Sequence, residues 1–209
     1  MKIEKASDNS LLSQYLDGDY SAFEVLYTRH KGGVYRYLLR QLHNEVLTED
    51  IFQDVWSRVI TQADSFNANS RFSTWLYTIA RHKLIDHIRH VKVVDTIIET
   101  PKNEQGTEST VEAAKVSTTP EAIHQQNQQW QAIDLCLQKL PTHQLDCFLL
   151  REESGLALSD IAIIVNAGLE ATKSRLRSAY SNLKLCLEKR IDVSDIITRG
   201  EKYTRREAP

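Results

Sequence analysis

Residues 71–90 read RFSTWLYTIARHKLIDHIRH, a stretch without Gly or Pro that predicts a helix. One apolar stripe follows the i, i+3, i+4, i+7 spacing of a core-facing side and consists of Phe72, Trp75, Leu76 and Ile79. A second apolar set lies on nearly the opposite side and consists of Leu84, Ile85 and Ile88. A polar strip remains between them beside the Trp75 position, formed by Thr78, His82 and Arg89.

This strip combines positive charge with an aromatic edge. A nucleic acid suits such a surface, because its phosphates bind the cationic groups and an unstacked base lies on the aromatic ring. The alternative is the solvated edge of a buried helix. The stretch alone leaves these two interpretations open.

The composition predicts a soluble globular protein with two separate basic regions. A chain of 209 residues, 41% hydrophobic and 26% charged, is long enough for one large domain or two small ones. The net charge of -2 does not by itself favour a nucleic-acid-binding protein. However, residues 71–92 hold five Lys and Arg against one acid, and residues 171–190 hold six against one. We therefore expect two separated DNA contacts.

The N-terminal residues MKIEKASDNS lack the apolar segment of a signal peptide, and no uncharged apolar run approaches the ~18 residues of a membrane span. We therefore expect a cytoplasmic protein without membrane insertion of its own. Cys136, Cys147 and Cys186 are odd in number and widely spaced within apolar helical patterns. Buried free thiols are the favoured interpretation, ahead of a disulfide or a metal site.

Residues 8–91 are predicted as a first, almost entirely helical domain. The segment SAFEVLYTRHKGGVYRYLLRQL has a helical repeat that we expect to be interrupted or bent near Gly32 and Gly33. In LTEDIFQDVWSRVI, Thr48 is the expected N-cap. Its expected inward row is Ile51, Val55 and Val59. Asp, Ser and Asn in TQADSFNANSR predict a loop before the next helix.

Residues 92–120 are predicted as a flexible linker. They contain no aromatic residue, are rich in Thr, Ser, Glu and Lys, and include two prolines, so they lack the means to build a core. Residues 121–190 predict a second helical domain with N-caps at Thr142 and Ser159. Its last two helices, joined by AGLE with a turn at Gly168, indicate a helix-turn-helix. The tail, residues 191–209, receives no role.

The final helix has two distinct faces. Its expected packed face consists of Thr172, Leu176, Ala179, Leu183 and Leu187. The opposite face carries Glu170, Lys173, Ser174, Arg177 and Ser181, with Arg175 on the flank. Short polar and basic side chains near the start of a second helix suit a DNA major groove. An ordinary solvated face is the alternative.

Five motifs carry a family resemblance: AFEVLYTRH, EDIFQDVWSRV, FSTWLYTIARHKLIDHIR, LQKLPTHQLDCFLL and LSDIAIIVNAGLEATKSRLRSA. In order and approximate spacing they resemble bacterial RNA polymerase sigma factors of the extracytoplasmic-function (ECF) type, over residues 12–188 apart from the linker. The resemblance implies an all-α fold of two small helical domains joined by a flexible linker, the second containing a helix-turn-helix. It also implies an alternative sigma factor that binds core RNA polymerase and promoter DNA to direct promoter-specific transcription initiation, under control of an anti-sigma factor. No enzymatic activity, cofactor or metal is expected.

The same resemblance implies roles for individual residues. The positions that would meet the polymerase are Asp50, Gln53 and Asp54. The loop from Asp64 to Arg71 resembles a base-capturing loop, so the downstream promoter surface would comprise Phe66, Asn67, Arg71, Trp75, Thr78, His82 and Arg89. The upstream promoter surface would comprise Glu170, Ala171, Lys173, Ser174, Arg175 and Arg177. The chain departs from the family at His82, where Asn is common, and at EATKSR, where GTVKSR is commoner, which leaves the promoter sequence open.

Two other functions compete with this interpretation. An enzyme would need a catalytic or metal site, and His82, Asp86, His87 and His90 supply only helical pairs without further ligands. A stand-alone helix-turn-helix regulator would bind DNA through residues 121–190 but would leave the acidic face around Asp50 without a role.

Overall fold

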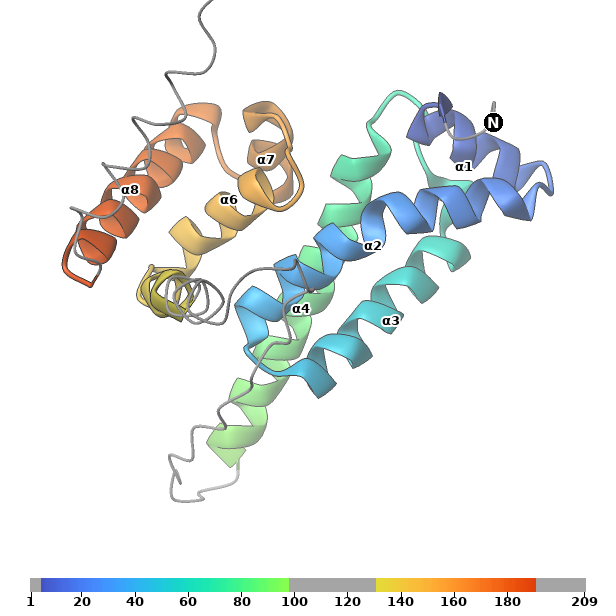
Figure 1. Ribbon diagram of the computed structural model, residues 1–209. Helices are drawn as coiled ribbons and strands as arrows, with labels where there is room; N and C mark the ends of the chain where they lie inside the picture. Colours follow the sequence, from blue (N-terminus) through green and yellow to red (C-terminus); the bar gives the residue numbers. More distant parts are fainter. Residues whose placement is uncertain (1–4, 98–130, 191–209) are drawn as a thin grey trace, which may run out of the picture.

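The computed structural model describes residues 5–97 and 131–190, and these residues form helices joined by turns (Figure 1). The N-terminal unit contains α1 (Asp8–Leu16), α2 (Tyr20–Leu42), α3 (Glu45–Thr61), the short 3-10 helix η2 (Ala63–Ser65) and α4 (Phe72–Ile97). The C-terminal unit contains helical residues 131–137, α6 (Thr142–Glu152), α7 (Leu158–Ile164) and α8 (Leu169–Glu188). Neither unit contains a strand in the described ranges, and the predicted all-α fold is confirmed.

Several helix boundaries differ from the predicted ones. Asn44, not Thr48, is the N-cap of α3, and its side chain accepts a hydrogen bond from the Leu47 amide at 3.0 Å. Thr48 lies inside the helix, where its hydroxyl donates to the Asn44 carbonyl at 2.7 Å. Likewise, Thr142 and Ser159 fall within α6 and α7 rather than capping them. The N-cap residues of α6 and α7 are Pro141 and Ala157, and neither makes a side-chain cap hydrogen bond. A polar residue near the start of a helix therefore does not by itself locate the cap.

Gly32 and Gly33 do not break α2, which continues without interruption from Tyr20 to Leu42. A Cβ atom on Gly33 would lie 2.7 Å from the Tyr77 hydroxyl oxygen and 3.0 Å from the Glu153 carbonyl oxygen. The absence of a side chain therefore allows the backbone of the C-terminal unit to approach α2 closely.

The core of the N-terminal unit follows the predicted helical faces. The inward row of α3 is buried, and so are the stripe positions Phe72, Leu76 and Ile79 of α4, while Trp75 is half-buried. α4 continues to Ile97, past the predicted domain boundary at residue 91. The rest of the predicted linker, residues 121–130 of the predicted second domain and the tail lie outside the described residues.

The C-terminal unit packs α6 against α8, with α7 beside both. Of the predicted packed face of α8, Thr172, Ala179 and Leu183 are buried, whereas Leu176 and Leu187 are half-buried. The turn before α8 differs from the expectation, because Asn166 adopts the left-handed conformation with φ 51° and Gly168 is the extended N-cap residue with φ -65°. Asn tolerates that conformation better than most side chains.

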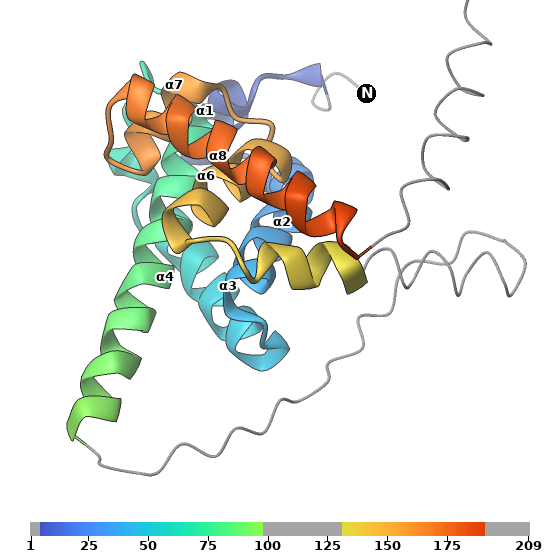
Figure 2. The same ribbon diagram turned by 90° about the vertical axis from the view of Figure 1, so that its left-hand side faces the viewer.

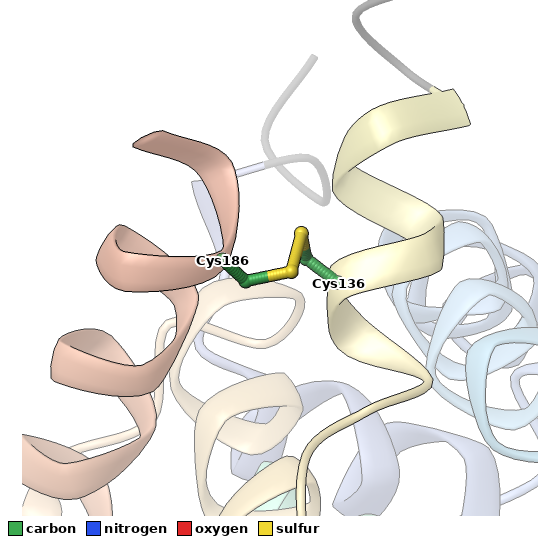
Figure 3. Close-up of a disulfide and its surroundings, with 2 residues drawn as sticks. All are labelled: Cys136 and Cys186. Carbon is green, nitrogen blue, oxygen red and sulfur yellow. A yellow bond between two sulfur atoms is a disulfide. The ribbon is translucent and has the colours of Figure 1, made fainter. Parts of the chain in front are cut away.

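A disulfide joins Cys136 to Cys186, so the expectation of three free thiols is wrong (Figure 3). The two Cα atoms lie 5.8 Å apart although the residues are 50 positions apart in sequence. Cys136 lies in helical residues 131–137, and the C-terminal part of α8 returns beside this segment. Cys147 remains a buried free cysteine. The pairing depends on the packing of two distant helices, which cysteine spacing does not reveal.

The two units pack against each other, with α7 on α4 and α6 on α2 (Figure 2). None of the helices within residues 5–97 and 131–190 is both long and apolar enough to cross a membrane.

Candidate nucleic-acid interface

The outer face of α3 presents Asp50, Gln53 and Asp54, and all three side chains are exposed. The Gln53 amide donates to Glu49 at 3.1 Å, and Asp54 pairs with Lys83 of α4 at 2.9 Å. The three predicted polymerase-binding residues therefore share one face, opposite the buried row of the same helix.

An apolar groove of about 380 Å³ runs beside this face, between α2 and α3. Its lining residues are Tyr27, Glu49, Phe52, Gln53, Trp56, Ser57, Ile60 and Thr61. Tyr27 and Trp56 meet edge-to-face with 4.8 Å between ring centroids, and Ile60 is 47% exposed. The sequence pattern does not place these aromatic residues on a surface, because their helical spacing is equally typical of a core.

A second groove, of about 770 Å³, separates α3 from α4 and brings two predicted surfaces together. Asp54 of the predicted polymerase face and His82 of the polar strip line it from opposite helices. The same groove includes Asp86, His87 and His90. Among the described residues, no group of three or more His, Cys, Asp or Glu side chains is arranged to hold a metal ion.

The loop before α4 is joined to that helix through aromatic contacts. Phe66 lies 5.3 Å from Trp75 and 6.3 Å from Phe72, measured between ring centroids. Phe66 and Trp75 are half-buried, and Asn67 is exposed. The Asn67 side chain accepts a hydrogen bond from the backbone amide of Asn69 at 3.0 Å, and this local bond stabilises the turn of the loop.

Asn9 of α1 holds this loop in place, a role that was not predicted from the sequence. Its side-chain amide donates to the carbonyl groups of Ala68 at 3.0 Å and Ser70 at 2.8 Å. Its side-chain oxygen accepts from the Phe72 amide at 3.0 Å, at the first residue of α4. No signal in the sequence identifies such a cap, because Asn9 is 63 positions from Phe72.

The polar strip on α4 is accessible in part. His82 and Arg89 are exposed, whereas Thr78 is half-buried and its hydroxyl donates to the Thr74 carbonyl at 2.7 Å. At the start of the helix, the Arg71 side chain is 70% exposed and its guanidinium pairs with Asp160 of α7 at 3.2 Å. The predicted downstream surface therefore begins beside the C-terminal unit at Arg71, and the exposed members of the strip lie further along α4.

On α8, the predicted DNA-reading residues mostly share one exposed face. The exposed members are Glu170, Ala171, Lys173, Ser174 and Arg177. Lys173 pairs with Glu170 at 2.6 Å. Arg175 is half-buried instead and faces Cys147. Burial raises the pKa of the Cys147 thiol, and the Arg175 guanidinium partly opposes that rise.

Known proteins resemble this chain in sequence and in fold. The family model for sigma-70 region 2 matches residues 26–92. The RNA polymerase sigma factor YlaC of Bacillus subtilis (strain 168) is 30% identical over 164 residues, which cover 78% of this chain and 90% of that protein. The ECF RNA polymerase sigma factor SigW of the same organism is 28% identical over 173 residues, covering 83% and 92%.

A solved structure of the sigma factor RpoE from Bartonella quintana, in complex with the anti-sigma factor NepR, has a similar fold. Its TM-score is 0.66 at 20% identity, and the superposition covers 79% of this chain and 96% of that one. This likeness extends across both helical units.

Proposed function

Because the chain belongs to the RNA polymerase sigma factors of the ECF type, we propose that it directs core polymerase to promoters through one protein-binding and two DNA-binding surfaces. The observation that carries the proposal is the exposed face of α3 formed by Asp50, Gln53 and Asp54, beside the apolar groove between α2 and α3. Acidic groups next to an apolar groove suit a partner whose docking surface combines apolar and basic side chains. We assign this face to the core polymerase.

The downstream promoter element is assigned to the loop of Phe66 and Asn67 and to the polar strip of α4. Exposed amide and imidazole groups beside half-buried aromatic rings suit unpaired nucleotides, which offer hydrogen-bonding edges and flat faces for stacking. A base within an intact duplex offers no face to Trp75. The proposed role is therefore to hold DNA strands that have separated.

The upstream promoter element is assigned to the exposed face of α8. Lys173 and Arg177 lie near the beginning of the second helix of the helix-turn-helix, and both are exposed. Such side chains reach base edges or phosphates when the helix enters a major groove. Arg175 is assigned a supporting role at the edge of this surface, because it is half-buried.

The finer organisation and regulation belong to the same proposal. We assign residues 8–91, extended to the end of α4 at Ile97, and residues 121–190 to the two functional domains, and the rest of the predicted linker 92–120 to the connection between them. We assign the cytoplasm as the place where the protein acts. The RpoE structure contains an anti-sigma factor. We infer that this chain too is controlled by such a partner, whose chemistry must complement at least one of the surfaces described above.

Run-off transcription with purified core polymerase on genomic DNA tests the proposal. Discrete transcripts are expected only when the full chain is added, and core polymerase alone is the control. Tight, specific promoter binding without polymerase, combined with no transcript in its presence, would instead support a stand-alone regulator. That outcome would overturn the assignment of the α3 face.

A further inference from the structure

The Asn9 side chain of α1 makes three hydrogen bonds to the backbone of the loop before α4. Its Nδ2 donates to the carbonyl groups of Ala68 and Ser70, and its Oδ1 accepts from the amide of Phe72. An asparagine amide carries two N–H donors and one acceptor oxygen, so these three backbone groups use both of its polar atoms. The same three groups fix the orientation of the side chain, because two of them accept and one donates.

Asp8, the residue before Asn9, anchors α1 to α2. Its carboxylate accepts a hydrogen bond from the Arg29 guanidinium at 2.8 Å and lies 2.8 Å from His30 Nε2. The hydrogen bond with His30, together with Arg29, holds the pKa of Asp8 below its ordinary value in spite of burial. The His30 ring also packs on Phe72, with 5.3 Å between ring centroids. Two adjacent residues of α1 therefore join α2 to the loop.

The bonds of Asn9 extend through Ser70 to the loop residues that the proposed function assigns to DNA. The Ser70 amide and hydroxyl both donate to the Asn67 carbonyl, at 2.9 Å and 2.6 Å. Phe66, one residue earlier, packs on the ring of Phe72, whose backbone amide is bound by Asn9. The placement of Phe66 and Asn67 thus depends on a side chain from another helix.

We propose that Asn9 is a positioning residue for the downstream promoter surface: it keeps the loop in the conformation in which Phe66 and Asn67 receive an unpaired base. Asn9 acts through the loop rather than by contacting DNA. A loop that is ordered before binding avoids the entropy cost of being ordered by the base, so the base binds more tightly. This inference rests on the proposed function, because the shape of the loop matters to DNA only if the loop receives a base.

The variant Asn9→Asp separates the two roles of the side chain. A carboxylate still accepts from the Phe72 amide, but its second oxygen faces the carbonyls of Ala68 and Ser70 where the asparagine donated to them. Ser10→Asp is the matched control, since it adds the same charge at the next, exposed position and leaves the three bonds in place.

The first measurement is the affinity of the holoenzyme, formed with core polymerase, for a single-stranded oligonucleotide. The oligonucleotide carries the downstream element of a promoter mapped by run-off transcription, and an abasic site replaces one nucleotide at a time. For the wild type and Ser10→Asp, we expect one abasic position to weaken binding at least about fivefold, the lower end for one stacked base. Asn9→Asp should lose this dependence and bind the intact oligonucleotide about as weakly as the wild type binds the abasic one.

The second measurement is hydrogen exchange of the Asn69 and Ser70 amides in the protein without DNA. Both amides are hydrogen-bonded to Asn67 within the loop. We expect their exchange to become about tenfold faster in Asn9→Asp, since the loop then opens more often, and to stay unchanged in Ser10→Asp.

A wild-type abasic penalty in Asn9→Asp, or loop exchange no faster than in Ser10→Asp, would overturn the inference. A lower melting temperature with the abasic penalty intact would likewise show that Asn9 only stabilises the fold. If Asn9→Asp loses helix content by circular dichroism, Asn9→Ala provides both measurements, because it removes the donors without adding a charge. A wild-type holoenzyme that transcribes but is indifferent to every abasic position would overturn the downstream assignment, and the inference with it. This result is distinct from a failure confined to the variant.

Discussion

The hydroxyl group of Tyr37 donates a 2.8 Å hydrogen bond to the carboxylate of Asp146, across 109 positions of sequence. Tyr37 is fully buried on α2, and Asp146 is buried on α6. The bond therefore links the two helical units through groups that are buried from solvent. The stability of the packed structure therefore depends on whether the Tyr37 hydroxyl is protonated.

Alkaline pH should destabilise the packed form through its buried tyrosines. Burial raises the pKa of Tyr37 well above its ordinary value of 10.0, and the nearby Asp146 carboxylate raises it further. Below pH 10 the folded and unfolded chains both keep the proton, so the stabilisation is complete. Above about pH 10 the unfolded chain loses the proton first, and the free energy of unfolding falls as the pH rises toward the folded-state pKa.

Urea unfolding between about pH 9 and pH 11 measures this fall. Tyr37→Phe should unfold about 1 kcal/mol more easily at neutral pH, because Asp146 loses a donor, and should lose less stability on going to alkaline pH. If the free energy of unfolding of the Phe variant falls with pH as steeply as that of the wild type, groups other than Tyr37 cause the alkaline destabilisation. Tyr180 is one contributor that remains, since burial followed by its hydrogen bond to Glu152 raises its pKa to about 12.

Charge reversal on the exposed face of α3 should weaken polymerase binding. Asp50→Lys is expected to leave the melting temperature nearly unchanged and to cost several kcal/mol of affinity for core polymerase, because it reverses a charge in a complementary interface. Glu24→Lys makes the same charge change on α2 and serves as the control. Native affinity of folded Asp50→Lys protein for core polymerase would remove this face from the mechanism.

Two alanine variants of α8 test the upstream surface. Lys173→Ala or Arg177→Ala should weaken promoter binding by about 1 to 3 kcal/mol if the side chain contacts a base. A phosphate contact should instead lower the salt slope of binding by about 1. Titrations at several salt concentrations distinguish these cases, with Lys184→Ala, an exposed residue later on the same helix, as the control. If the two variants and the control behave alike, α8 does not read the promoter.

The polar strip should act on opened DNA. Thr78→Ala/His82→Ala is expected to keep the wild-type melting temperature within a few degrees, since His82 is exposed and the Thr78 hydroxyl bonds only to its own helix among the described contacts. It should bind core polymerase and closed promoter normally but initiate poorly on duplex DNA. Stacking worth ~1 to 3 kcal/mol per base offsets the cost of unpairing.

A template already mismatched at the downstream element should restore much of this variant's transcription, because unpairing is then no longer required. The measurement compares initiation rates on the duplex template and on the mismatched template. Wild-type rates on duplex DNA, or a defect that the mismatch fails to relieve, would favour the simpler interpretation of α4 as having a solvated edge.

The disulfide should stabilise the C-terminal unit. Cys136→Ser/Cys186→Ser is expected to lower its free energy of unfolding by about 2 to 4 kcal/mol, the range for a cross-link that closes a long loop. A reducing agent should likewise lower the melting temperature of the wild-type protein. The double variant, which lacks the disulfide, is the control for other effects of the reductant. If the reductant lowers the melting temperature of both proteins equally, reduction of this disulfide is not the cause.

The sequence determined which side of each long helix is buried. Because the helical period of 3.6 residues places i, i+3, i+4 and i+7 on one side, apolar spacing predicted the buried row Ile51, Val55 and Val59 of α3 and the buried Ala179 and Leu183 of α8. The same argument placed Lys173 and Arg177 on an exposed face, and it placed Asp50 opposite the buried row of α3. These features depend on residues within a few turns of one another, and such distances are fixed by the backbone.

Tertiary structure decided the contacts between residues far apart in the chain. Gly33 predicted a helix break, yet it allows Glu153 to approach an unbroken α2. Asn9 holds the loop before α4, Cys136 forms a disulfide with Cys186, and the buried Asp146 accepts a hydrogen bond from Tyr37. Each of these depends on how helices from distant segments are placed in space. A local pattern specifies which side of a helix avoids water, but many partners satisfy that requirement, and only the complete packing selects one.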